Sequence, residues 1–269
     1  MTAFIIVISV LVFLILTFLF LIFPSGRKHP DLELIKGSFI AHRGLHDISP
    51  ETPENSAAAF RAAVEAGYPI ENDIHLTADG EVVVFHDDTL RRMCGIDGEP
   101  EKMTLAELRK LRLAGTDEQI PTLEECLFEV GGKVPLLIEF KCRGIDCTAL
   151  CEAADAVLSK YNGKYLVQSF YPTVLRWYKK NRPEVCRGQL ASAFRSQKLY
   201  KKLLGCLLFN FMARPDFISY EHKYASHPCF RLCRTLGAFP VGWTFRYQSD
   251  VYRRRNDFNT YIFEGFIPK

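Results

Sequence analysis

The strongest constraint on the fold comes from residues 39–88, where short apolar runs end in polar residues. The run F-I-A ends in His42 and Arg43, and the run V-V-V-F ends in His86. A buried strand of this kind places its polar side chains at its carboxyl end, where α/β barrels and open α/β sheets bind ligands. The pattern therefore predicts parallel strands with a site at their carboxyl ends.

Between these two runs, residues 70–74 read I-E-N-D-I. Side chains alternate between the two faces of a strand, so Glu71 and Asp73 share one face and the isoleucines take the other. Two neighbouring carboxylates repel each other unless a cation lies between them, and hard oxygen ligands suit Mg²⁺ or Ca²⁺. Asp79-Gly80 predicts a hairpin turn that brings His86 back towards this face. A solvated acidic face is the alternative interpretation.

Taken together, these motifs resemble those of the glycerophosphodiester phosphodiesterase family. The resemblance rests on H-R-G at 42–44, P-E-N at 53–55, E-x-D at 71–73, H-D at 86–87 and I-E-F-K at 138–141. It covers about residues 38–269 and implies a TIM barrel that hydrolyses a glycerophosphodiester to glycerol 3-phosphate and an alcohol. At the last strand, Phe263-Glu264-Gly265 departs from the expected Thr-Asp pair, so Glu264 is given no role.

A further pair of charged residues lies on the third expected barrel strand, at 135–141. Glu139 and Lys141 share one face of this strand. We expect Glu139 to complete a metal cage with the two acidic residues of 71–73. We expect Lys141 to face the substrate phosphate, because a compact ammonium suits an oxyanion. A surface ion pair is the alternative interpretation.

The rest of the chain alternates strands with helices. Further strands are expected at 165–170, 186–190, 217–220, 241–244 and 260–263, and helices at 54–66, 104–111, 122–130, 148–160 and 173–180. The helices at 104–111 and 122–130 begin with the capping-box pattern Thr-x-x-Glu and are expected on the outer ring. With the strands that end at Arg43, Asp73 and Lys141 there are eight, and the strand before His86 is a hairpin extension. This alternation predicts an α/β fold, the (β/α)₈ TIM barrel.

The amino-terminal segment reads as a membrane anchor. Residues 3–23 carry no charge, and a helix of that length spans a bilayer. A cleaved signal peptide fits less well, because no Lys or Arg precedes the run and no small-x-small cleavage site follows it. Arg27 and Lys28 follow the run, so the positive-inside rule places the catalytic part in the cytoplasm. We expect a single-pass cell-membrane protein with an anchor at 1–25, a linker at 26–37 and a barrel at 38–269.

Composition excludes some classes of protein. A net charge of +3 gives no case for a nucleic-acid surface. The nine cysteines follow no disulfide framework, which agrees with a reducing compartment, and we expect free thiols. Two basic stretches, 198–212 and 253–255, are expected to be an outer barrel helix and a solvated charge run, with lipid contact as the alternative.

The family resemblance assigns the remaining roles. His42 and His86 are expected to share the proton transfers as general base and general acid, in either order. Arg43 is expected to assist at the phosphate, and Glu54 to orient a neighbouring group or touch the metal. By analogy with the family, the nucleophile is the substrate's own glycerol hydroxyl. Trp243 falls where the family often places a tryptophan at the pocket rim, and core packing explains it equally well.

Two other functions remain open. One is a lysophospholipase D or phospholipase-C-like phosphodiesterase that acts on membrane lipids, which the anchor would place beside its substrate. The other is an inactive, membrane-tethered binding barrel. The sequence disfavours the inactive barrel, because every motif residue of the resemblance is present.

Overall fold

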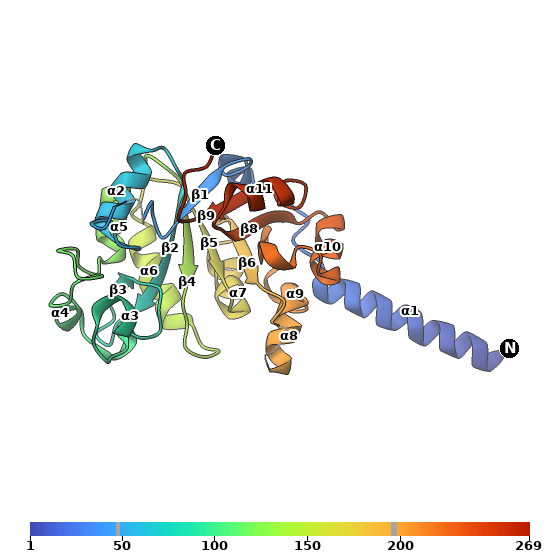
Figure 1. The fold of residues 1–269 in the computed structure, drawn as a ribbon. Helices are drawn as coiled ribbons and strands as arrows, with labels where there is room; N and C mark the ends of the chain where they lie inside the picture. Colours follow the sequence, from blue (N-terminus) through green and yellow to red (C-terminus); the bar gives the residue numbers. More distant parts are fainter. Residues whose placement is uncertain (47–48, 195–197) are drawn as a thin grey trace.

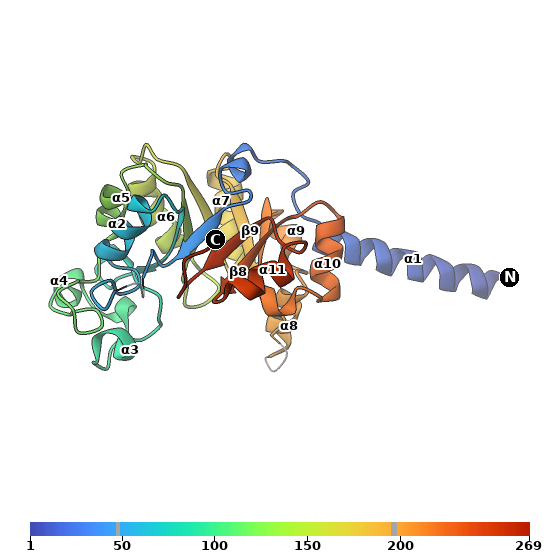
Figure 2. The ribbon, with the colours of Figure 1, turned by 45° about the horizontal axis from the view of Figure 1, so that its top comes forward.

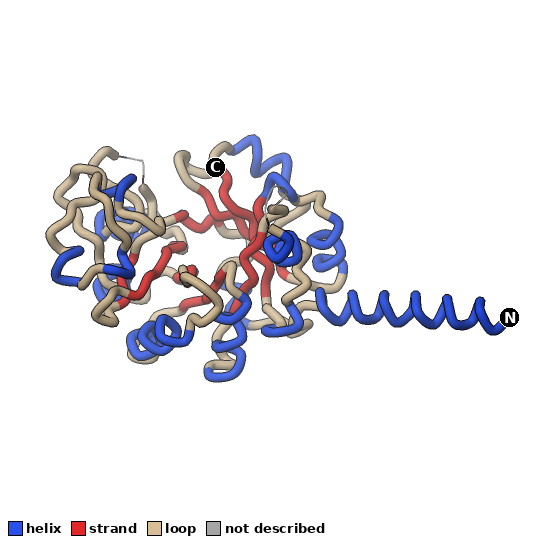
Figure 3. Tube along the Cα trace, turned by 90° about the horizontal axis from the view of Figure 1, so that it is seen from below, coloured by secondary structure: helices blue, strands red, loops and turns tan. Residues whose placement is uncertain are grey.

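Eight parallel strands form a closed barrel in the computed structural model, which describes residues 1–46, 49–194 and 198–269. The strands pair in the order β1-β9-β8-β7-β6-β5-β4-β2, and β1 also pairs with β2 to close the ring (Figures 1 and 3). The strand β3 (Val82–Val84) extends β2 as an antiparallel hairpin. The predicted TIM barrel with a hairpin extension is confirmed. The barrel strands are β1 (Phe39–His42), β2 (Ile70–Leu76), β4 (Leu136–Phe140), β5 (Tyr165–Ser169), β6 (Arg187–Ala191), β7 (Phe217–Glu221), β8 (Phe239–Phe245) and β9 (Thr260–Phe263).

Helices follow most of the strands and cover the outside of the barrel (Figure 3). The helix α5 (Leu123–Val130) begins at a capping box, in which the side chains of Thr122 and Glu125 each accept a hydrogen bond from the other's backbone N–H. The other helices around the strands are α2 (Ala57–Glu65), α6 (Thr148–Leu158), α7 (Pro172–Asn181), α8 (Leu199–Gly205), α9 (Asn210–Ala213), α10 (Pro228–Thr235) and α11 (Gln248–Arg254), with the 3₁₀ turn η3 (His222–Tyr224).

The first of these helices begins later than the expected segment 54–66. Ser56 is the N-cap of α2, and its hydroxyl accepts a hydrogen bond from the backbone N–H of Ala59 at 3.1 Å. Asn55, just before it, has a left-handed φ of 55°, which is incompatible with a right-handed helix. Glu54 therefore lies in the loop after β1 and not on a helix.

The helix expected at 104–111 is wrong in length and in place. Its capping box at Thr104 is present, but α4 spans only Leu105–Leu108. It belongs to an insertion between β2 and β4 that also holds β3, α3 (Arg91–Cys94) and η2 (Pro100–Lys102) (Figure 1). Leu108 packs in a small apolar cluster of this insertion, with Val83, Phe85, Leu90, Met93, Leu113 and Ile120. The segment therefore builds a satellite core beside the barrel and not part of the outer ring.

Apolar side chains fill the amino-terminal end of the barrel interior. They include Ile40, Leu137, Leu166, Val241 and Ile262. Leu32 and Ile35, in and after the 3₁₀ turn η1 (Pro30–Leu34), pack against them and are 5% and 1% exposed. The segment expected to be a linker thus covers this end of the barrel, and polar residues occupy the opposite, carboxyl end.

The helix α1 (Thr2–Ile22) extends away from the barrel (Figures 1 and 2). Its mean hydropathy of 3.4 and its length make it a candidate membrane span. It contacts the barrel domain only near its carboxyl end, within the described residues, mainly through α9. The basic segment 198–212 forms the two short helices α8 and α9, separated at Leu207, whose φ is 60°.

Candidate active site

Three buried carboxylates meet at the carboxyl ends of β2 and β4. The parallel register sets Asp73 beside Glu139, and Glu71 lies on the same face as Asp73. One oxygen from each carboxylate lies within 4.8 Å of the other two. The three side chains sit on rigid neighbouring strands and are almost completely buried. The structure thus brings together the residues that the sequence suggested as metal ligands.

The ammonium of Lys141 partly balances the charge of these carboxylates. Its Nζ atom lies 3.0 Å from Asp73 Oδ1 and 2.6 Å from Glu139 Oε1. Burial, together with the charges of Asp73 and Glu139, raises the pKa of Glu71 well above its ordinary value. Burial opposes ionisation of Asp73 as well, but Lys141 and other nearby cations lower its pKa. The carboxylate group therefore has room for more positive charge than Lys141 provides.

The donor set fits a hard divalent cation. The Asn55 amide donates to Asp73 Oδ2 at 2.9 Å, and the Gln168 amide donates to Glu71 Oε1 at 3.2 Å, so two of the three carboxylates are held by side-chain amides. Gln168 Oε1 is buried and accepts no hydrogen bond within the described residues, and Asp73 Oδ1 has the ammonium of Lys141 at 3.0 Å. Buried oxygens without a partner are costly, and Mg²⁺ and Ca²⁺ bind oxygens of this kind.

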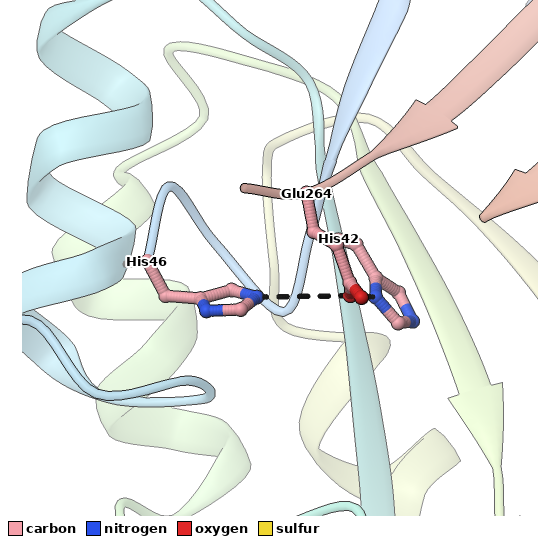
Figure 4. A group of neighbouring side chains, drawn as sticks. All are labelled: His42, His46 and Glu264. Atoms are coloured by element: carbon pink, nitrogen blue, oxygen red, sulfur yellow. Dashed lines mark hydrogen bonds and ion pairs between the residues drawn. The ribbon is translucent and has the colours of Figure 1, made fainter. Parts of the chain in front are cut away.

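His42, at the end of β1, is held by an acid from the last strand. Its Nδ1 atom donates a hydrogen bond to Glu264, which follows β9 (Figure 4). Its Nε2 atom lies 3.9 Å from Glu71 Oε2. Arg246 binds the other oxygen of Glu264 at 2.6 Å, and His46 lies 3.9 Å from the carboxylate. With Nδ1 donating to Glu264, Nε2 carries the free lone pair in the neutral ring.

The pKa values of this pair follow from its surroundings. Burial and the neighbouring Arg43 cation lower the pKa of His42 to about 4, although the hydrogen bond to Glu264 acts in the opposite direction. Burial opposes ionisation of Glu264, but the hydrogen bond from His42 and the charge of Arg246 lower its pKa well below the ordinary range. Near neutral pH the pair is therefore a neutral imidazole beside an ionised carboxylate.

His86 occupies the other side of the site and has its own acidic partner. Its Nδ1 atom donates to Asp87 Oδ1 at 2.7 Å, and Arg92 donates to Asp87 Oδ2 at 2.6 Å. Arg92 also binds Glu54, which in turn accepts a hydrogen bond from Arg43 Nη1 at 2.7 Å. A continuous chain of charged groups therefore links Arg43 through Glu54, Arg92 and Asp87 to His86, and Arg92 is its centre. Glu54 contacts two guanidinium groups and is not among the three carboxylates of β2 and β4.

These groups face one cavity of about 200 Å³. Its polar wall is formed by His42, Arg43, Glu71, His86, Glu139, Lys141, Gln168, Thr244 and Arg246, and its apolar wall by Phe170, Leu190, Trp243 and Ile262. The rings of Trp243 and Phe170 meet edge to face, 5.8 Å apart. The cavity thus offers cations and proton-transfer groups on one side and an aromatic surface on the other.

Several residues of the site carry no role in the sequence interpretation. Gln168 interrupts the apolar run Y-L-V-Q-S-F, and a buried amide on a barrel strand is a detectable signal. Glu264 is visible only as an acid at the end of the last strand. Arg92, on the short helix α3, and Arg246, just after β8, follow no local pattern, because the fold brings them to the site.

The fold and this set of side chains define a barrel hydrolase of the phosphodiesterase class. Residues 42–257 match the glycerophosphoryl diester phosphodiesterase family. The chain therefore belongs to this family, and the resemblance seen in the sequence is confirmed.

Relatives and solved structures agree with this assignment. A glycerophosphodiester phosphodiesterase of Caldanaerobacter subterraneus subsp. tengcongensis is 36% identical over 168 residues, which cover 58% of this chain and 67% of that protein. A human lysophospholipase D is 29% identical over 185 residues, 63% of this chain and 57% of that protein. The alignments thus span about two thirds or less of these curated relatives.

Among solved structures, an Oleispira antarctica phosphodiesterase in complex with the product sn-glycerol-3-phosphate is 27% identical, with a TM-score of 0.70. The match covers 85% of this chain and 93% of that one. A glycerophosphodiester phosphodiesterase of Thermotoga maritima is also 27% identical, with a TM-score of 0.64, and the match covers 84% and 93% of the two chains.

Proposed function

We propose that this chain hydrolyses glycerophosphodiesters to glycerol 3-phosphate and an alcohol, with a bound Mg²⁺ or Ca²⁺ ion. The observation that carries the proposal is that one cavity is lined by both histidines and by two of the three carboxylates, Glu71 and Glu139. The ion would be held by Glu71, Asp73 and Glu139. When bound, it neutralises charge on the phosphoryl oxygens, which is the main requirement of phosphodiester cleavage.

The cationic side chains hold the diester in place. Arg43 is fixed by Glu54, so its guanidinium needs little reordering to bind a phosphoryl oxygen. Lys141 provides a second positive charge from the floor of the cavity. Trp243 and Phe170 form the apolar wall against which the carbon skeleton of the substrate packs.

The two histidines have different environments, which supports a different role for each. Nε2 of His42 carries a free lone pair, because Nδ1 donates to Glu264, and it is the general base for the substrate's glycerol hydroxyl or for water. The His86 side chain is 31% exposed, against 13% for His42, and Asp87 holds its Nδ1 atom, so its Nε2 atom is free to meet the leaving oxygen. His86 is accordingly the general acid that protonates the leaving alcohol.

A second candidate function is lysophospholipase D activity, or a phospholipase-C-like activity, on lipids of the membrane. Two observations favour it: the candidate membrane span is attached directly to the barrel, and one wall of the cavity is aromatic. A relative with 29% identity is described as a lysophospholipase D. The acyl chain on the glycerol of such a substrate would extend from the cavity towards the bilayer.

The proposed location is the cell membrane, with α1 as a single span and the barrel in the cytoplasm. Arg27 and Lys28 follow the span directly, as the positive-inside rule requires. All nine cysteines are free thiols in the described chain, which agrees with a reducing compartment.

The test is product release by the full chain in lipid nanodiscs: glycerol 3-phosphate from a glycerophosphodiester, and lysophosphatidic acid or monoacylglycerol from a lysophospholipid. The substrates are glycerophosphocholine, glycerophosphoethanolamine and a lysophospholipid, each with Mg²⁺, with Ca²⁺ and with EDTA. We expect metal-dependent release that His42→Ala and Glu71→Ala both abolish, and the preferred substrate distinguishes the two candidate activities. Absence of turnover on every diester in the presence of either ion would contradict the proposal and favour a binding barrel.

A further inference from the structure

The carboxyl end of α1 is attached to the barrel by side chains that cap it. Asn210 donates to the carbonyl oxygen of Ile22 at 2.8 Å, and the Cys233 thiol donates to the same oxygen at 3.2 Å. Arg214 Nη1 donates to the carbonyls of Phe20 and Phe23 at 2.7 and 2.8 Å. The last carbonyls of a helix have no partner within the helix, so these side chains satisfy the groups that the helix leaves open.

The chain after α1 leaves no slack between the helix and the barrel. The backbone N–H of Ser25 donates to the carbonyl of Pro215 at 3.0 Å. Arg27 forms two hydrogen bonds with the buried carboxylate of Asp216, at 2.5 and 2.8 Å. The direction of α1 is therefore fixed relative to the barrel. A bilayer that α1 spans must then meet one particular side of the barrel.

That side carries α8, α9 and α10, which lie at the end of the barrel from which α1 extends in both ribbon views (Figures 1 and 2). Phe211 on α9 faces Phe20, with ring centroids 6.2 Å apart. On α8, Leu199 and Tyr200 are 72% and 53% exposed, which is unusual for large apolar side chains placed together on a short helix.

Positive charge gathers on the same side. Residues 198–236 contain seven basic and two acidic side chains, an excess larger than the net charge of +3 of the whole chain. Both acids are engaged: Asp216 is buried against Arg27, and Glu221 accepts a hydrogen bond from Ser192 at 2.6 Å. Lys198, Lys201 and Lys202 flank the exposed apolar residues of α8 in the sequence. Exposed apolar side chains with lysines beside them suit an anionic lipid surface.

We propose that the tip of α8 is a second membrane contact: Leu199 and Tyr200 enter the interfacial layer of the bilayer, and the three lysines bind anionic lipid headgroups. The helix α8 follows β6, whose Leu190 lines the cavity, so it stands on the carboxyl side of the barrel, where the cavity opens. The contact therefore sets the cavity mouth beside the membrane surface. The inference rests on the proposed span by α1 but not on catalysis.

Fluorescence quenching by brominated lipids tests the contact in the full chain. Leu199→Trp and Tyr200→Trp are prepared in nanodiscs that contain phosphatidylglycerol and phosphatidylcholine, with and without bromine on the acyl chains. Phe128→Trp is the matched control, because Phe128 is 84% exposed on α5, a helix on the side of the barrel away from α1 (Figure 1). The two native tryptophans are common to all variants, so difference spectra isolate the new one.

We expect the fluorescence added at 199 and at 200 to be quenched by brominated lipid, and that added at 128 to be unaffected. Quenching at 199 should decrease when the three lysines of α8 are changed to glutamine, or when phosphatidylglycerol is omitted. Equal behaviour at 199, 200 and 128 overturns the proposal. A blue shift of the tryptophan emission at 199 without quenching by bromine also overturns the proposal. It would mean that protein, such as a second copy of the chain, and not lipid covers α8.

Two further measurements separate this inference from the proposed function. Elution of the chain with the nanodiscs tests the span by α1, and circular dichroism tests whether each variant is folded. Quenching needs no turnover, so loss of activity in every variant would count against the proposed enzyme and leave the α8 contact standing. Quenching confined to the 128 variant would refute the contact even in an active enzyme.

Discussion

Replacement of Glu264 by alanine should reduce turnover without weakening substrate binding. Glu264 fixes the His42 ring through Nδ1 and is itself held by Arg246 at 2.6 Å, but it does not line the cavity. Without the carboxylate, the ring can rotate and the proton can move to Nε2, which removes the base. General acid–base catalysis contributes about 10²–10⁴-fold to a rate, and we expect Glu264→Ala to forfeit about 10–100-fold in kcat. This corresponds to about 1.4–2.7 kcal/mol in the activation free energy.

The assay is steady-state release of glycerol 3-phosphate, with kcat and KM determined separately. Glu264→Gln keeps an oxygen that can accept the hydrogen bond, so its loss should be smaller than that of alanine. Asp155→Asn is the matched control: Asp155 on α6 is also an arginine-paired carboxylate, bound to Arg182 at 2.6 and 2.7 Å, and is 14% exposed against 11% for Glu264. A kcat of Glu264→Ala within about twofold of wild type, or an equal loss in the control, would refute the role of Glu264 in holding the base.

Two predictions concern stability. Burial and the charges of Asp73 and Glu139 raise the pKa of Glu71 above its ordinary 4.5. The folded metal-free protein therefore binds more protons at this group than the unfolded chain does. The stabilising contribution of Glu71 is consequently lost as the pH rises above 4.5 and through the raised pKa. In EDTA, the stability of Glu71→Gln relative to wild type should therefore increase with pH, by up to about 1.4 kcal/mol of unfolding free energy per pH unit. The measurement is the melting temperature of both proteins as a function of pH, and parallel curves would contradict the prediction. Gly188→Ala places a Cβ 2.0 Å from the Phe217 ring in the barrel wall. It should lower the free energy of unfolding by about 1–3 kcal/mol, which urea denaturation would show as a lower midpoint. An unchanged midpoint would show that the ring moves freely.

Features within a single strand could be predicted from the sequence, because strand geometry is local. The period of two places Glu71 with Asp73, and Glu139 with Lys141, whatever surrounds the strands. The turn at Asp79-Gly80 is equally local: Gly80 has a φ of 88°, and β3 pairs antiparallel with β2 as expected. Capping boxes likewise fixed the starts of two helices correctly.

Features that depend on which surfaces meet could not be predicted. The segment 104–111 has a helical start signal and apolar residues, but neither shows that it packs on the satellite cluster of the insertion. The two contacts of Arg92 could not be predicted either. Its partners Glu54 and Asp87 lie on different loops, which the fold brings together at Arg92 only when the barrel closes. Local patterns specify elements, whereas packing partners depend on the whole fold.

The position of His42 shows how barrel closure completes the site. Its strand β1 lies between β2 and β9, and the register sets His42 beside Glu71 on one side and Ala41 beside Phe263 on the other. His42 follows Ala41 and Glu264 follows Phe263, so the histidine and the glutamate are neighbours at the ends of the two strands. Because a shift of one residue would turn every side chain to the opposite face, this register is what gives the imidazole one acid at Nδ1 and another near Nε2. The two acids are 193 positions apart in the chain, so no motif links them; the closed ring of strands does.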